Sequence, residues 1–258
     1  MRLIIGFLII NIGFIAASIH LQQGLESYWD FVAFSVVIFG TISVMFINRP
    51  AISAKTIFRN FKSSIFESHT ETKQFVGECI SFARGQGIKS KKKTIENQFL
   101  IDGTELIDLG FNFEKIEGIL TQRYQFHAKN VTQIANWLRK NSKYPPAFGL
   151  AGTVLGLIHL MRGISDGINP QETGIRMAVA LVATFYGLVI ANIILNPVGE
   201  LLLEKLKHDE EKSEVALTTI RLMMEKASLI EIQEELNSFV ESDHKINILS
   251  DLSVEGIA

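Results

Sequence analysis

The stretch PPAFGLAGTVLGL at Pro145–Leu157 and the stretch MAVALVATFYGLVIAN at Met177–Asn192 decide the fold of this chain. Both are apolar and contain no Asp, Glu, Lys or Arg. In each stretch small residues recur at steps of three and four, namely Gly149, Gly152 and Gly156 in the first and Ala180, Ala183, Gly187 and Ala191 in the second. This spacing gives a helix one face without side-chain bulk, which is typical of helices that pack closely in lipid.

Four apolar runs predict transmembrane helices at residues 3–19, 31–47, 146–161 and 177–195. Each holds about 16–19 residues, close to the ~20 that a helix needs to cross ~30 Å of hydrocarbon. A cleaved signal peptide at residues 1–18 is an alternative for the first run. Two retained helices are the simpler interpretation, because a second run follows after a short loop. The expected fold class is all-α, a polytopic membrane protein with four transmembrane helices and a helical cytoplasmic region.

The charge distribution orients these spans. Residues 48–145 hold 16 Lys/Arg against 9 Asp/Glu, and residues 200–258 hold 6 against 14. The connection at residues 20–30 contains no Lys or Arg, so the positive-inside rule places both termini in the cytoplasm. We expect four parts, which are an N-terminal transmembrane hairpin at 1–47, a cytoplasmic helical region at 48–145, spans three and four within 146–199, and an acidic cytoplasmic helical tail at 200–258.

The cytoplasmic region carries two amphipathic patterns. The longer pattern has apolar or aromatic residues on one helix face, at Ile116, Leu120, His127, Val131, Ile134 and Leu138. Asn112 with Glu114 predicts the start of that helix. The shorter pattern consists of Phe75, Cys79 and Phe82. The single cysteine excludes an intramolecular disulfide, and we interpret it as a core residue.

The sequence offers no catalytic residue, because it contains no arrangement of nucleophile, base and oxyanion donors. It also lacks a metal-ligand spacing and a phosphate-binding loop. The basic block is too mixed in sign for a nucleic-acid surface. We therefore expect neither an enzyme nor a protein that needs a metal, a cofactor or nucleic acid.

Two hydroxyls stand among the small residues of the last two spans. Thr153 and Thr184 lie mid-membrane, where a hydroxyl either bonds its own backbone or faces a wet pathway. The four predicted spans contain no Asp, Glu, Lys or Arg. Because an ion pathway usually needs an intramembrane carboxylate, a conducting role would require that group from another chain.

The two opening stretches closely resemble the last two spans of MotA and PomA flagellar stator proteins, of the MotA/TolQ/ExbB proton channel family. FGTISVMFINRP at Phe39–Pro50 and NPV at Asn196–Val198 resemble the ends of the second and fourth spans in that family. The resemblance implies a pentamer in the bacterial inner membrane around two copies of a MotB/PomB-like, peptidoglycan-anchored partner. That partner supplies an ion-binding aspartate, and H⁺ or Na⁺ flow drives the rotor protein FliG.

The resemblance also assigns roles to single residues of this chain. Pro146 and Pro197 match the two functional prolines of the family, and Thr153 and Thr184 match pore-facing positions. Ala183 stands where sodium-type members carry a third threonine. Arg84 matches a rotor-contacting arginine. The acidic residue expected about eight positions later is absent, and the chain there carries the lysines Lys91, Lys92 and Lys93.

Three alternatives remain at this point. A TolQ/ExbB-like energiser of the same superfamily usually has three spans, so the paired N-terminal spans argue against it. A non-flagellar motor of the same kind stays open. The third alternative, from a different class of protein, is a membrane scaffold or receptor whose helices conduct no ions.

Overall fold

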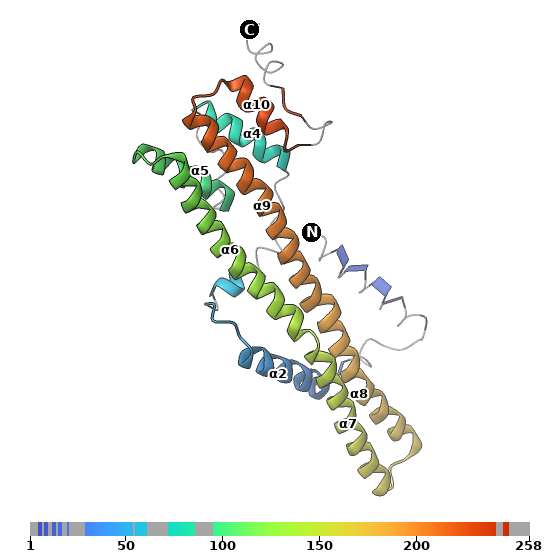
Figure 1. Cartoon of the computed structure of the whole chain (residues 1–258). Helices are drawn as coiled ribbons and strands as arrows, with labels where there is room; N and C mark the ends of the chain where they lie inside the picture. The colour runs from blue at the N-terminus through green and yellow to red at the C-terminus, as the bar shows by residue number, and fades with distance from the viewer. Residues whose placement is uncertain are drawn as a thin grey trace. The chain divides into compact units, whose positions relative to one another are not determined.

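The computed structural model of the chain describes residues 29–53, 55–60, 72–85, 95–240 and 245–247, and scattered positions between 5 and 20. Over these residues the chain is helical and contains no strand. It divides into two compact units. Unit 1 combines residues 1–67 with 131–203, and unit 2 combines residues 68–130 with 204–258. The all-α prediction is confirmed, and Figure 1 shows the helices.

Unit 1 is built from α2 (Phe31–Ile47), α7 (Tyr144–Ser165), α8 (Pro170–Val189) and the π-helix η2 (Ile190–Leu195). The antiparallel pair α7 and α8 makes the most extensive contact between helices, and α2 packs against both. The main-chain N–H of Asp30, which caps α2, also donates to Tyr186 Oη of α8 at 3.1 Å. The start of α2 is thereby tied to the last turn of α8.

The turn between α7 and α8 is shorter than the apolar runs suggested. The runs end at residue 161 and begin again at residue 177, whereas only residues 166–169 lie outside the two helices. Gly167 adopts a φ of 85°, a conformation that glycine reaches without strain. Asn169 then caps α8, because its side chain accepts a hydrogen bond from the Glu172 N–H at 2.8 Å.

Within the part of the chain that the structure describes, two continuous helical segments are long and apolar enough to cross a membrane, at Phe113–Ser165 and Pro170–Met224. They contain the predicted third and fourth spans. The predicted second span coincides with α2, a shorter apolar helix. Most of the predicted first span, residues 3–19, lies outside the described residues, so the count of four spans stays a prediction.

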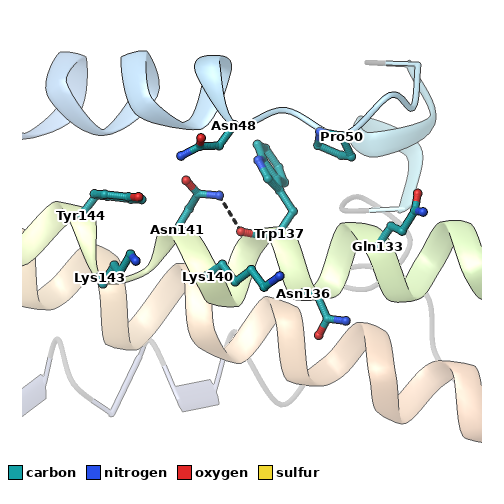
Figure 2. A pocket seen from close by; sticks show the side chains of 9 residues that line it. All are labelled: Asn48, Pro50, Gln133, Asn136, Trp137, Lys140, Asn141, Lys143 and Tyr144. Carbon is teal, nitrogen blue, oxygen red and sulfur yellow. Dashed lines mark hydrogen bonds between the residues drawn. The ribbon is translucent and has the colours of Figure 1, made fainter.

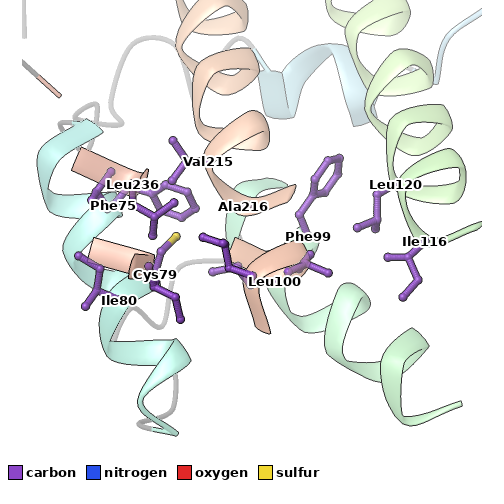
Figure 3. Close-up of a cluster of buried hydrophobic side chains, with 14 residues drawn as sticks. Phe75, Cys79, Ile80, Phe99, Leu100, Ile116, Leu120, Val215, Ala216 and Leu236 are labelled. Atoms are coloured by element: carbon purple, nitrogen blue, oxygen red, sulfur yellow. The ribbon is translucent and has the colours of Figure 1, made fainter. Parts of the chain in front are cut away.

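Unit 2 consists of α4 (Thr72–Ala83), α5 (Ile95–Asp108), α10 (Leu229–Asn237) and the adjoining parts of α6 (Phe113–Asn141) and α9 (Asn196–Met224). Its interior is a cluster of large apolar side chains, shown in Figure 3. Phe75 and Cys79 of α4 are fully buried there and Phe82 packs against the cluster, so the prediction for this helix is confirmed.

The long amphipathic pattern forms α6. Asn112 caps the helix, with its Oδ1 accepting from the Lys115 N–H at 3.3 Å. The aliphatic residues of the pattern are all buried, namely Ile116, Leu120, Val131, Ile134 and Leu138. His127 differs, because about a third of its side chain is exposed and its Nε2 lies 3.9 Å from Asp209 Oδ2.

Candidate functional site

The glycines of α7 lie directly against the backbone of α8. A Cβ atom added at Gly149 would lie 2.8 Å from the carbonyl oxygen of Ala183 and 2.9 Å from the Cα of Thr184. One added at Gly156 would lie 2.6 Å from the Cβ and 3.0 Å from the Cα of Ala180. These distances leave no room for a side chain. The small-residue face therefore allows the two helices to approach within one chain.

Gly187 makes the same kind of contact at the other end of the helix pair. A Cβ atom there would collide with the carbonyl group of Pro145 and lie 2.9 Å from the Cα of Pro146. Both prolines stand in the first turn of α7, where proline costs no helical hydrogen bond. Pro146, predicted to belong to the ion pathway, thus lies against α8 at the start of α7.

The two predicted threonines meet between these helices. Thr153 Oγ1 of α7 lies 2.6 Å from Thr184 Oγ1 of α8, 3.0 Å from the carbonyl oxygen of Ala180 and 3.2 Å from that of Gly149. A hydroxyl has one proton, so Thr153 donates to only one of these oxygens at a time. Four oxygens therefore converge at one point, between helices whose apolar runs carry no Asp, Glu, Lys or Arg.

Ala183 takes a different direction from its neighbour Thr184. It is 1% exposed and belongs to a small cluster with Ala33 and Val37 of α2. A Cβ atom added at Gly152 would lie 2.8 Å from its Cβ. Within the single chain, Ala183 fills the contact between three helices.

The fourth apolar run ends in an irregular helix. Residues Ile190–Leu195 form η2, in which the Asn196 N–H donates to the carbonyl of Ala191. Pro197 follows in the first turn of α9 and has no N–H to donate. π-helical segments inside α-helices are frequent at functional sites. The sequence contained the proline, whereas the wider helical turn before it was not predicted.

Comparison with known proteins identifies this arrangement. Residues 91–215 match the model described as the MotA/TolQ/ExbB proton channel family, a region that includes α7, α8 and η2. Over these residues the chain is similar to the MotA/TolQ/ExbB family.

Relatives extend the likeness over most of the chain. The uncharacterized protein YtxD of Bacillus subtilis is 27% identical and covers 86% of this chain and 79% of its own length. Motility protein A of Borreliella burgdorferi is 28% identical, and the match covers 72% of this chain and 73% of that protein. In a solved structure, the flagellar MotAB stator complex from Bacillus subtilis, a chain matches with a TM-score of 0.75 at 20% identity, covering 95% of this chain and 98% of that chain.

Of the predicted rotor-contact residues, Arg84 lies among the described residues of unit 2. Arg84 directly follows α4, and its Nε is buried without a hydrogen-bond partner among the described residues. Lys91, Lys92 and Lys93 lie outside the described residues. The structure therefore locates one of the four predicted rotor-contact residues.

Sequence reasoning missed a polar cluster near the α7–α8 turn. Arg176 donates to Glu172 at 2.6 Å on the same helix, and its Nη1 lies 3.2 Å from His159 Nε2 of α7. Glu172 and Arg176 are one helical turn apart, a spacing that favours an ion pair. That spacing was visible in the sequence, but the pairing with α7 depends on the register of the two helices.

Proposed function

We propose that this chain is the ion-conducting, torque-generating subunit of a flagellar motor stator. It would couple H⁺ or Na⁺ flow to rotation of the flagellar rotor. The observation that carries the proposal is the meeting of the Thr153 and Thr184 hydroxyls between two closely packed helices, in a chain similar to the proton channel family. Ion passage needs a polar lining inside an apolar helix pair, and this is where the chain supplies one.

A second subunit would supply the group that carries the ion. The predicted spans of this chain contain no carboxylate, and a related chain was solved as part of a MotAB complex. We infer a MotB/PomB-like partner, anchored to peptidoglycan, whose membrane-embedded aspartate faces Thr153 and Thr184. Pro146 and Pro197 would flank this pathway, and Ala183 would hold its helix against α2.

The proposed assembly is a pentamer of this chain around two copies of the partner, in the bacterial inner membrane. Both termini would be cytoplasmic, because the basic residues gather in region 48–145 and the short connection at 20–30 has none. Unit 2 would then lie in the cytoplasm, where it would contact the rotor protein FliG.

Partner dependence is tested by ion flux in liposomes. The chain alone is expected to carry no flux above empty vesicles, and the chain with its partner is expected to carry flux that an Asp→Asn change in the partner abolishes. A pH-sensitive dye, with and without sodium, distinguishes the two ions, and we expect protons because Ala183 adds no side-chain oxygen. Flux through the partner-free chain at the rate of the complex would contradict the proposal.

Rotor contact is tested by reversing charge around Arg84. Single exposed charge pairs contribute roughly 0–1 kcal/mol, so Arg84→Glu alone is expected to slow swimming only slightly. Reversal of Arg84 together with Lys91, Lys92 and Lys93 is expected to abolish torque while leaving assembly intact. The control reverses Lys115 and Lys129, two lysines of α6 outside this loop. Unchanged swimming in the fourfold variant would place the contact elsewhere.

A further inference from the structure

A polar pocket of about 610 Å³ lies in unit 1, beside the junction of α6 and α7. Figure 2 shows its lining, to which the end of α2 contributes Asn48 and the following Pro50. Trp137 and Asn141 point from α6 toward that segment. The volume is in the range of small-molecule sites, about 300–1,000 Å³. None of the proposed ion-pathway residues lines it.

The pocket carries positive charge. Lys140 and Lys143 line it, and none of the described residues in its lining is Asp or Glu. Neither lysine forms an ion pair among the residues that the structure describes. The Lys143 ammonium lies 5.2 Å from the centre of the Tyr144 ring, a cation–π contact that holds it at the pocket. Two free cations in one concave site favour an anionic ligand.

Among the described residues, two buried polar atoms at the pocket lack hydrogen-bond partners. Asn141 is 2% exposed, and its Nδ2 donates to the Trp137 carbonyl at 2.7 Å while its Oδ1 has no hydrogen-bond partner. The indole Nε1 of Trp137 is also buried without an acceptor. Such atoms are rare in folded proteins and favour a ligand that carries both a hydroxyl donor and an oxygen acceptor. Both are closed to water, so a ligand reaches them only after a side chain of the pocket wall changes rotamer.

The position of the pocket along the chain restricts the ligand further. Asn48 directly follows the apolar helix α2, and Tyr144 is the first residue of α7, which contains the third apolar run. The pocket therefore lies where both helices leave their apolar segments. Trp and Tyr are the residues enriched at the level of lipid headgroups, and lysines next to a span attract anionic lipids.

We propose that this pocket binds the headgroup of an anionic phospholipid on the cytoplasmic side of the membrane. Lys140 and Lys143 hold the phosphate. A headgroup hydroxyl donates to Asn141 Oδ1, and a phosphate or hydroxyl oxygen accepts from Trp137 Nε1. The acyl chains follow the exposed apolar surface of α2, where Phe46 and Ile47 are 72% and 75% exposed. This inference requires a membrane location and does not require that the chain conducts ions.

The test uses the fluorescence of Trp137 in the full-length chain. The protein has two tryptophans, and Trp29→Phe leaves only the one in the pocket. The detergent-solubilised oligomer is titrated with phosphatidylglycerol, with phosphatidylcholine and with inorganic phosphate. We expect a saturable change in Trp137 emission with phosphatidylglycerol and none with the other two. Saturation by inorganic phosphate at the same concentration would mean that the pocket binds a free anion and not a lipid. An equal response to phosphatidylcholine would contradict recognition of the lipid by its negative charge.

Matched variants decide whether the pocket is the site. Lys140→Gln with Lys143→Gln is expected to weaken phosphatidylglycerol binding about thirtyfold, since each juxtamembrane lysine contributes roughly a fivefold factor. The control is Lys115→Gln with Lys129→Gln, which removes the same charge from α6 outside the pocket and should bind like the parent. Asn141→Leu should weaken binding while keeping the oligomer intact by light scattering. Unchanged affinity in the pocket variant would overturn the proposal, and loss of the oligomer in that variant would identify the pocket as a contact between copies.

Discussion

The contact between α7 and α8 and the interior of unit 2 are both helix packing, yet they use opposite kinds of residue. Between α7 and α8, the glycines Gly149, Gly156 and Gly187 lie against main-chain atoms of the same chain. In unit 2, the helices are held by large side chains such as Phe75 and Leu120, each no more than 1% exposed. Even the glycine of that interior, Gly103, faces the end of a flexible side chain, Ile220.

The difference follows from the two solvents. In water, burying a large apolar side chain is itself favourable by about 1.5–3 kcal/mol, so bulky residues collect inside. In hydrocarbon that gain disappears, and helices associate through close packing and hydrogen bonds between them. A contact built from glycines and from the hydroxyl pair of Thr153 and Thr184 is therefore the form that α7 and α8 should take in lipid.

The largest effect is expected from adding bulk to the α7–α8 contact. In Gly156→Val, the new Cβ meets Ala180 Cβ and Cα, and main-chain atoms cannot move aside as a side chain can. Overpacking typically costs about 1–3 kcal/mol, and here the helices must separate, so we expect loss of the oligomer and of motility. Native electrophoresis and a swimming assay measure both.

Gly174→Val is the control for that change. Gly174 lies in α8, and an added Cβ meets nothing within 4 Å, so the substitution changes helix propensity equally without a collision. We expect it to assemble and swim like the parent. Equal loss in both variants would mean that helix propensity, and not close packing, explains the result.

The second prediction tests the opposite rule in unit 2. Phe75→Ala removes a ring that is 1% exposed and should reduce the free energy of unfolding by about 3–5 kcal/mol, through lost burial and the cavity left behind. Phe126→Ala removes the same atoms from a side chain that is 69% exposed. This variant should change the free energy of unfolding by less than about 0.5 kcal/mol. Urea titration of the full chain measures the difference, with proteolysis of unit 2 as the readout of its unfolding. Similar losses in both variants would contradict the contrast between the two regions.

Periodicity predicted α4 and α6, because burial on one face leaves a pattern in the sequence, and hydropathy predicted α2, α7 and α8. The caps at Asn112 and Asn169 both begin helices at local signals, and the first of these was predicted. The turn at residues 166–169 was not, because polar residues such as Glu172 and Arg176 continue α8 beyond its apolar run. Hydropathy marks the apolar part of a helix and does not mark where the helix itself ends.

The site was predicted in type but not in arrangement. Thr153 and Thr184 stood out as hydroxyls in apolar runs, yet their 2.6 Å approach depends on the register between α7 and α8. The orientation of Ala183 toward α2 and the π-helix before Pro197 also depend on packing against other helices. Contacts between segments far apart in the chain leave no local pattern, and this is the part that sequence reasoning could not reach.

The smallest effect is expected at the hydroxyl pair, and it separates packing from conduction. Thr153→Val keeps the shape of the side chain and removes one oxygen, so Thr184 loses its partner while the glycine contacts remain. A hydrogen bond of this kind contributes about 1 kcal/mol, so assembly should survive with a slightly lower melting temperature. Ion flux with the partner should fall much more than that loss explains, because the convergence of oxygens at the proposed pathway is broken. Thr153→Ser restores the hydroxyl and should recover flux, whereas normal flux in Thr153→Val would mean that the threonine pair serves packing alone.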